Sequence, residues 1–187
     1  MTAPTKLDAS RAALVVIDVQ EAFRKALPDF DALAAAVAAL IRGAGVVGIP
    51  VVVTEQYPKG LGRTVPEVAE HLPERTEPIE KVCFSAAEAD GFDLGGRGQA
   101  LVCGIEAHVC VHQTVMDLLG QGVEVHLARD AVGSRSPENK AVGLQRAEDA
   151  GAVPTSVETA LFELVGRAGT DEFKGVQQVV LDFAPSR

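Results

Sequence analysis

A cysteine at the start of an expected helix is well placed in this sequence to do chemistry. Residues 99–105 form an apolar run typical of a buried strand, and Val111, Val115 and Leu118 then recur at the spacing of an amphipathic helix. Cys110 lies in the first turn of that helix, where unpaired backbone N–H groups and the helix dipole favour a thiolate. The position therefore indicates a nucleophile. A small buried apolar residue is the alternative that the position alone leaves open.

A carboxylate lies near the end of the first expected strand. Residues 13–19 are an aliphatic run with one charged residue, Asp18. Such runs are typical of strands that are buried on both faces of a parallel sheet. Ligands of open α/β sheets bind beyond the carboxyl ends of the strands, and a carboxylate inside an aliphatic run is unfavourable unless it has partners. Asp18 is therefore a candidate site residue, with a cap for the following turn as the alternative.

A lysine occupies a comparable place further along the chain. Lys81 lies in a short strand-like segment, residues 78–84. In a doubly wound sheet the strand order reverses beside the first strand, so residues 13–19 and 99–105 become neighbours. If the chain has this topology, Asp18 and Cys110 face each other across the ligand crevice.

Strand-like and helical segments alternate along the whole chain. Alternation of this kind predicts a parallel sheet with helices on both faces and right-handed crossovers. We expect a doubly wound, three-layer α/β/α fold of the Rossmann-like type, with a mostly parallel sheet of about six strands in the order 3-2-1-4-5-6. The expected strands are residues 13–19, 49–54, 78–84, 99–105, 123–131 and 152–157. The expected helices are residues 28–47, 67–71, one that follows Ala107, residues 137–150 with Ser136 as N-cap, and residues 158–167.

No linker, repeat or low-complexity tract divides the chain. We expect residues 1–187 to form one domain, with a core at about residues 12–168 and a surface helix at about residues 170–183. The polar character of that last segment suits the surface or a subunit contact.

Composition and charge exclude several classes of protein. The 187 residues are 47% apolar and 23% charged, which is typical of a globular protein. With 17 basic and 26 acidic residues the net charge is −9 and no basic tract occurs, so we expect no nucleic-acid and no membrane partner. Cys83, Cys103 and Cys110 lack metal-type spacing and are odd in number, which argues against a disulfide framework. With no visible signal peptide and no expected apolar run of about 18 residues, a cytoplasmic location follows.

Four segments together resemble the isochorismatase-like cysteine hydrolase superfamily. They are VVIDVQEAF (residues 15–23), EKVCFSA (80–86), CGIEAHVCVHQTVMDLL (103–119) and DAVGSRSPENKAVGLQRAEDAGA (130–152). The resemblance covers nearly the whole chain and implies a hydrolase with an α/β fold. The loop after the second expected strand and the C-terminal tail are most similar to isochorismatase-domain proteins of unassigned substrate.

The resemblance assigns roles to particular residues. The Asp–Lys–Cys triad of the superfamily falls on Asp18, Lys81 and Cys110. Cys110 would attack a carbonyl carbon as a thiolate, Asp18 would take the thiol proton and return it to the leaving amine, and Lys81 would hold the pair and stabilise charge. The family's oxyanion donors correspond to the backbone N–H groups of Glu106 and Cys110, with a cis peptide between Ile105 and Glu106.

Further candidates lie around this triad. Gln20, Phe23, Tyr57 and Leu61 could form the wall of a substrate pocket, and each could equally serve core or loop packing.

The sequence departs from the metal-binding members of the superfamily. Nicotinamidase-type members follow the second strand with an Asp-x-His pattern and a further histidine, whereas residues 54–59 here read TEQYPK. His108 and His112 share a helix face, but no third ligand is evident. We therefore expect no metal and no cofactor.

The leading hypothesis is a metal-independent cysteine hydrolase that cleaves a C–N bond of a small amide, carbamoyl or ureide substrate through a Cys110 thioester. Members specialised for isochorismate can lack the cysteine, so its presence favours C–N hydrolysis. Two alternatives stay open: a vinyl-ether hydrolase that uses Asp18 as general acid without a covalent step, and a non-catalytic binding or scaffold protein. The resemblance also implies a homo-oligomer, a dimer or larger.

Overall fold

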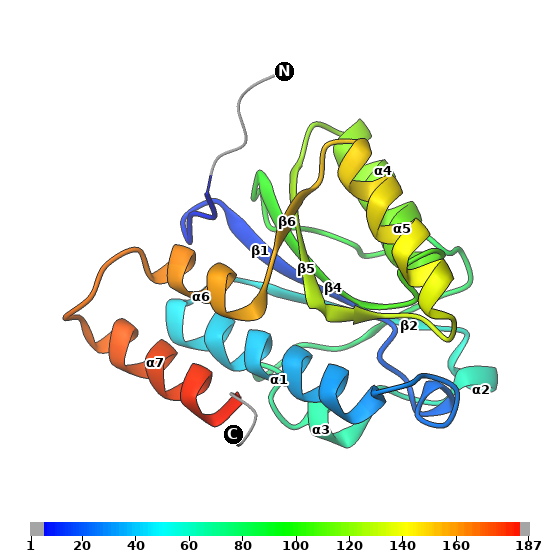
Figure 1. Ribbon diagram of the computed structural model, residues 1–187, viewed down its shortest axis with the longest axis horizontal. Coiled ribbons are helices and arrows are strands. Elements are labelled where there is room, and N and C mark those ends of the chain that lie inside the picture. Colours follow the sequence, from blue (N-terminus) through cyan, green and yellow to red (C-terminus); the bar gives the residue numbers. More distant parts are fainter. Residues whose placement is uncertain (1–5, 184–187) are drawn as a thin grey trace.

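Six parallel strands form the centre of the molecule, in the order β3-β2-β1-β4-β5-β6 (Figure 1). The computed structural model describes residues 6–183. The strands are β1 (Ala12–Ile17), β2 (Val51–Gln56), β3 (Ile79–Lys81), β4 (Gln99–Ile105), β5 (Glu124–Gly133) and β6 (Val153–Thr155). The expected doubly wound α/β fold and its strand order are confirmed. The order reverses between β1 and β4, which is where ligands bind in such sheets.

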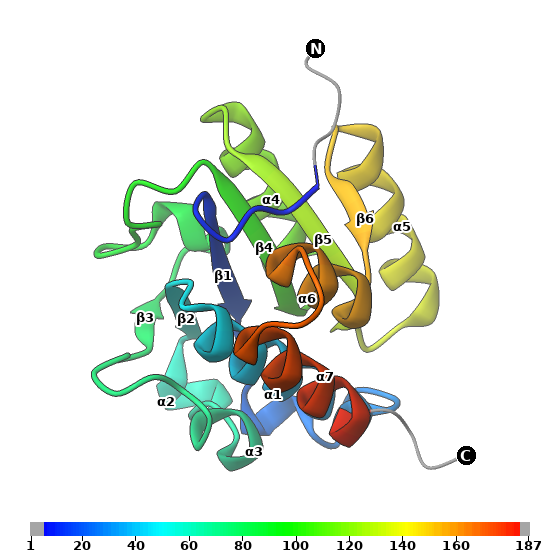
Figure 2. The same cartoon turned by 90° about the vertical axis from the view of Figure 1, so that its left-hand side faces the viewer.

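Helices cover both faces of this sheet (Figures 1 and 2). The face with the larger core carries α1 (Phe30–Val47), α6 (Val157–Val165) and α7 (Asp171–Phe183). The opposite face carries α4 (Cys110–Gly120) and α5 (Pro137–Asp149). The short helical pieces are η1 (Glu21–Phe23), α2 (Pro58–Leu61), α3 (Pro66–Ala69) and η2 (Ala86–Glu88).

The aliphatic run in β1 is explained by burial on both faces. Leu14 and Val16 point into the core beneath α1, whereas Val15 and Ile17 point into the core beneath α4. Because neighbouring side chains of a strand alternate between faces, a central strand needs apolar residues at every position. The strand stays apolar until Asp18, which begins the turn beyond it.

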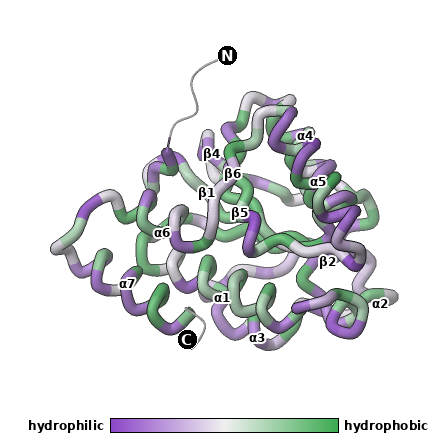
Figure 3. The backbone as a smooth tube through the Cα atoms, viewed as in Figure 1, coloured by the Kyte–Doolittle hydropathy of each residue, from purple (hydrophilic) through white to green (hydrophobic). Residues whose placement is uncertain are grey.

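Helix α1 corrects one expectation about apolar length. It has 18 residues and a mean hydropathy of 1.7, so by length and composition alone it could cross a bilayer. In the structure 61% of this helix is buried, and it packs between the sheet, α6 and α7. Figure 3 shows its hydrophobic character along most of its length. Its composition is therefore that of a helix in the protein core.

Element ends differ from the expected ones mainly where tertiary pairing decides them. Strand β2 continues through Glu55 and Gln56, which the sequence places in a loop, because they pair with Glu80 and Lys81 of β3. The expected cap of α5 is confirmed, since the Ser136 side chain accepts a hydrogen bond from the Asn139 backbone at 3.2 Å. The polar tail forms α7, whose Val176 and Val179 are buried against the core.

Gly104 lets β4 approach β1 closely at the edge that carries the candidate site. It lies beside Ile17 in the parallel register and has a φ of +121°. A Cβ atom at this position would lie 2.0 Å from the Ile17 carbonyl oxygen. Only glycine combines this backbone conformation with this contact. The close approach sets the end of β4 directly against the turn that begins with Asp18.

Replacement of Gly104 tests this packing. We expect Gly104→Ala to lower the free energy of unfolding by about 3 kcal/mol, because the methyl group meets the backbone of β1 and alanine disfavours the positive φ. Urea denaturation followed by circular dichroism measures the change. The control is Gly45→Ala on α1, where nothing lies within 4 Å of an added Cβ. We expect that control to be neutral or slightly stabilising, and equal stability of the two variants would contradict the close approach.

Candidate active site

A buried ion pair joins the ends of β1 and β3. The Lys81 ammonium lies 2.8 Å from Oδ2 of Asp18, and both side chains are almost fully buried. The other carboxylate oxygen, Oδ1, accepts a hydrogen bond from the Thr54 hydroxyl at 2.7 Å. Asp18 itself has a φ of +54°, which turns the chain out of β1. Both oxygens of Asp18 are therefore held in fixed directions by neighbouring strands.

The Lys81 ammonium is saturated with acceptors. Besides Asp18 it donates to the Gln56 side-chain oxygen at 2.7 Å and to the Phe84 carbonyl at 3.0 Å, with the Cys83 carbonyl at 3.3 Å. A lysine ammonium has three N–H donors. Because these contacts use all of them, Lys81 acts in this geometry as a fixed positive charge. Its acceptors are protein groups, and its hydrogen bonding also reaches the Cys110 thiol.

Cys110 is the first residue of α4 and lies in the field of this ion pair. Burial raises the pKa of its thiol to about 12, the Asp18 charge and its hydrogen bonding to the thiol act in the same direction, and Lys81 opposes them. The expectation of a depressed thiol pKa is therefore wrong. Removal of the sulfur from water outweighs the start of the helix and the lysine. The resting group is a neutral thiol beside a carboxylate that can accept its proton.

Thr114 anchors the first turn of α4. Its hydroxyl donates to the Cys110 carbonyl at 2.7 Å and accepts from the Ala86 backbone N–H at 2.8 Å. Ala86 begins η2, which follows the segment that carries Lys81. One hydroxyl therefore joins the cysteine turn to the lysine segment.

The peptide bond between Ile105 and Glu106 is cis, at the position that the resemblance implies. In the described part of the chain, neither the Glu106 nor the Cys110 backbone N–H donates to another protein group. An oxyanion site requires unpaired backbone donors of this kind; one belongs to the residue that carries the thiol and the other to the residue four positions before it.

The turn between β4 and α4 is held in place from the far side by α5. A Cβ atom at Gly143 would lie 2.5 Å from the carbonyl carbon and oxygen of Ala107. The Ala107 N–H donates to the Gly133 carbonyl at 2.9 Å. The glycine in α5 therefore permits direct contact between this helix and the backbone of the turn.

The Glu106 side chain bonds to Arg135, two residues beyond the end of β5. Its Oε1 accepts from the Arg135 backbone N–H at 2.9 Å and from the Arg135 Nε at 3.0 Å. Burial by itself raises the pKa of Glu106, but the hydrogen bonds and charge of Arg135 outweigh it and leave that pKa below its usual value. The ion pair ties the turn that contains the cis peptide to the end of β5.

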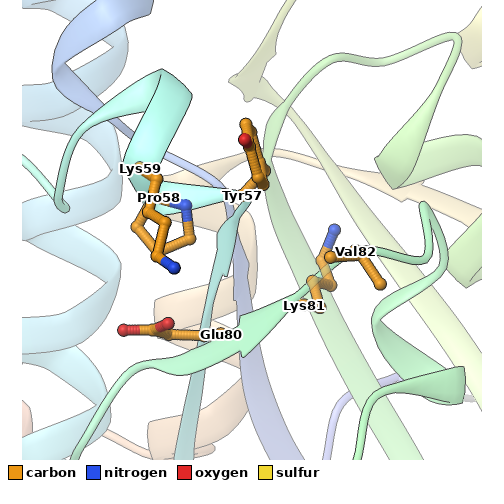
Figure 4. Close-up of a pocket in the computed structure, with 6 residues that line it drawn as sticks. All are labelled: Tyr57, Pro58, Lys59, Glu80, Lys81 and Val82. Carbon is orange, nitrogen blue, oxygen red and sulfur yellow. The ribbon is translucent and has the colours of Figure 1, made fainter.

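An open cavity of about 310 Å³ lies beside Lys81. Figure 4 shows it between the α2 segment and the end of β3. Its lining residues are Tyr57, Pro58, Lys59, Glu80, Lys81 and Val82.

The four candidate wall residues fall in different places. Tyr57 lines the cavity and is 55% exposed. Gln20 is fully buried, and its amide bonds to backbone groups of Gln56 and Gly62. Phe23 packs on the core beneath α1 and Leu61 ends α2 half-buried. Of the four, Tyr57 is the residue that the structure brings to the cavity.

His108 and His112, which the sequence places on one helix face, have different environments in the structure. His108 Nδ1 lies 3.1 Å from the Ser134 hydroxyl. His112 is buried, and burial, followed by the charge of Arg146, lowers its pKa. Within residues 6–183, no three His, Cys, Asp or Glu side chains gather in a way that could hold a metal ion.

Three residues that contribute to the site were not predicted from the sequence, namely Thr54, Gln56 and Thr114. Thr54 and Gln56 belong to the end of β2, so their position at the ligand rim of the sheet was the available signal. Thr114 lies four residues after Cys110, the spacing at which a threonine hydroxyl reaches a helix carbonyl.

A model of the isochorismatase domain matches residues 12–159. The chain belongs to this family of isochorismatase-like hydrolases. Isochorismatase domain-containing protein 2 of Pongo abelii is 39% identical over 175 residues, which cover 92% of this chain and 84% of that protein.

Two solved structures are also similar to this chain. The MAR1 ribonuclease of Caenorhabditis elegans is 38% identical with a TM-score of 0.91, over 97% of this chain and 95% of that one. The pyrazinamidase of Pyrococcus horikoshii in complex with zinc is 27% identical with a TM-score of 0.65, over 78% of this chain and 99% of that one.

The electrostatic environment of Cys110 predicts opposite effects of its two charged neighbours. Asp18→Asn should lower the thiol pKa and accelerate alkylation by iodoacetamide about tenfold at pH 8, because a full negative charge is removed. Lys81→Met should slow it. Peptide mass spectrometry measures the rate at Cys110, with buried Cys103 as the internal reference. A slower reaction in Asp18→Asn than in the wild type would contradict the inference that the charge of Asp18 raises the pKa of the thiol.

Proposed function

We propose that this protein is a metal-independent cysteine hydrolase that cleaves a C–N bond in a small amide, carbamoyl or ureide substrate. The observation that carries the proposal is the placement of a buried Asp18–Lys81 pair in direct electrostatic contact with the Cys110 thiol. The base and the orienting charge thus come from the ends of β1 and β3, and the nucleophile comes from the helix that follows β4. This is the arrangement of covalent catalysis with a general base.

The first step couples proton transfer to attack. The Cys110 sulfur bonds to the carbonyl carbon while the thiol proton moves to the Asp18 carboxylate, and the carbonyl π electrons move to oxygen. The backbone N–H groups of Glu106 and Cys110 then stabilise the oxyanion. Because burial raises the pKa of the thiol to about 12, a free thiolate is not populated at neutral pH. The Cys110 sulfur therefore becomes nucleophilic only as its proton moves to Asp18 in the presence of a substrate.

The second half returns the proton and restores the enzyme. The tetrahedral intermediate collapses, the C–N bond breaks, and protonated Asp18 gives its proton to the leaving nitrogen, which leaves a thioester on Cys110. Asp18 then takes a proton from water as the hydroxide adds to the thioester carbon. The C–S bond breaks, and the sulfur regains the proton from Asp18.

Lys81 has an electrostatic role in this scheme. Its N–H donors are used by protein acceptors, so it orients the Asp18 carboxylate and partly offsets its charge at the sulfur. Oxyanion stabilisation falls to the backbone donors. This differs from the expectation that Lys81 itself stabilises charge on the substrate.

The substrate that we propose is a small molecule and not a polymer. The cavity beside Lys81 measures about 310 Å³, at the lower end of the range of small-molecule sites, and it adjoins the site through Lys81, since neither Asp18 nor Cys110 lines it. The C. elegans relative is named as a ribonuclease. We propose no nucleic-acid substrate here, because the net charge is −9 and the sequence has no basic tract.

The same proposal includes self-association into a dimer or larger homo-oligomer. Val82 and Phe84 follow Lys81 in the sequence and are 79% and 51% exposed, so apolar surface adjoins the site. Light scattering of the purified protein measures the mass, and a monomer at micromolar concentration would contradict this part.

Trapping the acyl-enzyme tests the covalent step. Wild-type protein should hydrolyse members of a panel of amides, carbamoyl compounds and ureides, and acid quenching during turnover should show an acyl adduct on the peptide that contains Cys110. We expect Cys110→Ala to lose activity about a thousandfold or more. Cys83→Ala is the matched control and should keep activity.

The remaining results separate the alternatives. Isochorismate and a homopolymeric RNA belong in the same panel. Retained turnover of a vinyl ether by Cys110→Ala would favour general-acid catalysis by Asp18 without a covalent step. Cleavage of RNA would contradict the small-molecule proposal.

A further inference from the structure

Gln56 is a second side-chain acceptor of the Lys81 ammonium, besides Asp18. It is the last residue of β2 and pairs in register with Lys81 of β3. Its side-chain Oε1 accepts from Lys81 at 2.7 Å, and its Nε2 donates to the Val82 carbonyl at 3.0 Å. Because the nitrogen end has its own acceptor, the amide must present its oxygen to the ammonium.

A second glutamine fixes the backbone of the first. The Gln56 N–H donates to Gln20 Oε1 at 2.8 Å, and Gln20 Nε2 donates to the Gln56 carbonyl at 3.1 Å and to the Gly62 carbonyl at 2.6 Å. Gln20 is fully buried. Its own N–H donates to the Asp18 carbonyl at 2.9 Å, so the clamp begins in the turn that carries the carboxylate.

These contacts form one chain of hydrogen bonds that starts and ends at Asp18. It runs from the Asp18 turn through Gln20 to the Gln56 backbone, and from the Gln56 amide through Lys81 to the Asp18 carboxylate. A rigid chain of this kind fixes the direction of the ammonium more narrowly than the ion pair alone. Direction matters because a flexible lysine stem can place its charge in many positions.

The neutrality of the amide has an electrostatic consequence. At the sulfur, the negative charge of Asp18 and the positive charge of Lys81 act in opposite directions. A carboxylate at position 56 could also accept from the ammonium, but it would lose the hydrogen bond that Gln56 Nε2 donates to the Val82 carbonyl. It would also add a second negative charge to the buried site and cancel the field of Lys81 at Cys110.

We propose that Gln56 is a positioning residue for Lys81, locked in place by Gln20, and that it must be an uncharged acceptor for the thiol of Cys110 to react. This inference rests on the proposed cysteine hydrolase function, but its main test does not need a substrate. Gln56 and Gln20 act through Lys81 and are not assigned any contact with the reacting atoms.

The test compares the pH dependence of Cys110 alkylation in three proteins. Gln56→Glu keeps the length of the side chain and adds one charge, and Gln121→Glu adds the same charge at the exposed end of α4. Iodoacetamide labelling of the full chain between pH 7 and 11, read by peptide mass spectrometry, gives the rate at Cys110. We expect the Gln56→Glu profile to lie about one pH unit higher, which is about tenfold slower at a fixed pH. Gln121→Glu should match the wild type.

A charge-swap variant guards against simple damage to the fold. Asp18→Asn combined with Gln56→Glu leaves one carboxylate beside Lys81, so its profile should lie at lower pH than that of Gln56→Glu alone. If Gln56→Glu only disrupted packing, the second substitution would not restore reactivity. Thermal unfolding of each variant confirms that the labelled protein is folded.

Two results would overturn the proposal. The first is a folded Gln56→Glu protein whose profile superimposes on the wild type, and the second is an equal shift in Gln121→Glu. Gln56→Met, which has no comparable acceptor, adds a readout on any substrate found, and we expect kcat to fall about tenfold with KM within twofold. Failure to hydrolyse any substrate would count against the proposed function and leave the alkylation result to decide the role of Gln56.

Discussion

The contact between the Lys81 ammonium and the Asp18 carboxylate governs the organisation of this protein's candidate site. Both groups are removed from water, and a buried ion pair is tolerated only where further hydrogen bonds satisfy its remaining donors and acceptors. Thr54 supplies one such bond to the carboxylate, and Gln56 and the Phe84 carbonyl supply others to the ammonium. The ends of β1, β2 and β3 are therefore bound together by the same pair of charges that act on Cys110.

That arrangement gives the thiol an unusual resting state for a nucleophile. The N-terminus of α4 and the charge of Lys81 both favour the thiolate form of Cys110. Burial and the Asp18 carboxylate outweigh them and raise the pKa of the thiol to about 12. A neutral, buried thiol reacts more slowly with reagents in solvent than an exposed thiolate does. Reactivity then depends on a ligand that brings an electrophilic carbon to the sulfur, and proton transfer to Asp18 accompanies the attack.

Much of the fold could be predicted from the sequence, because its signals are local. Aliphatic runs and helical spacing identified the six strands, and their order followed from the doubly wound topology that such alternation favours. The edge at which Asp18, Lys81 and Cys110 meet follows from that topology. The direction of the thiol pKa could not be predicted, because it depends on how much water the packed site excludes. The roles of Gln20 and Gln56 were equally hidden. An amide can donate or accept, and only its partners across the sheet decide which end faces a charge.

The saturated ammonium of Lys81 separates two tasks that many enzymes assign to the same side chains. If the oxyanion is held by main-chain N–H groups and the lysine reaches only protein atoms, the reaction centre makes few side-chain contacts with the distinguishing parts of a substrate. Selectivity then resides in residues such as Tyr57 and Val82, which line the cavity from a short helix and a strand end. Substitutions there can change which compound is accepted while the reacting groups stay undisturbed. Such a division would let descendants of one ancestral protein change their substrates and keep the same reaction.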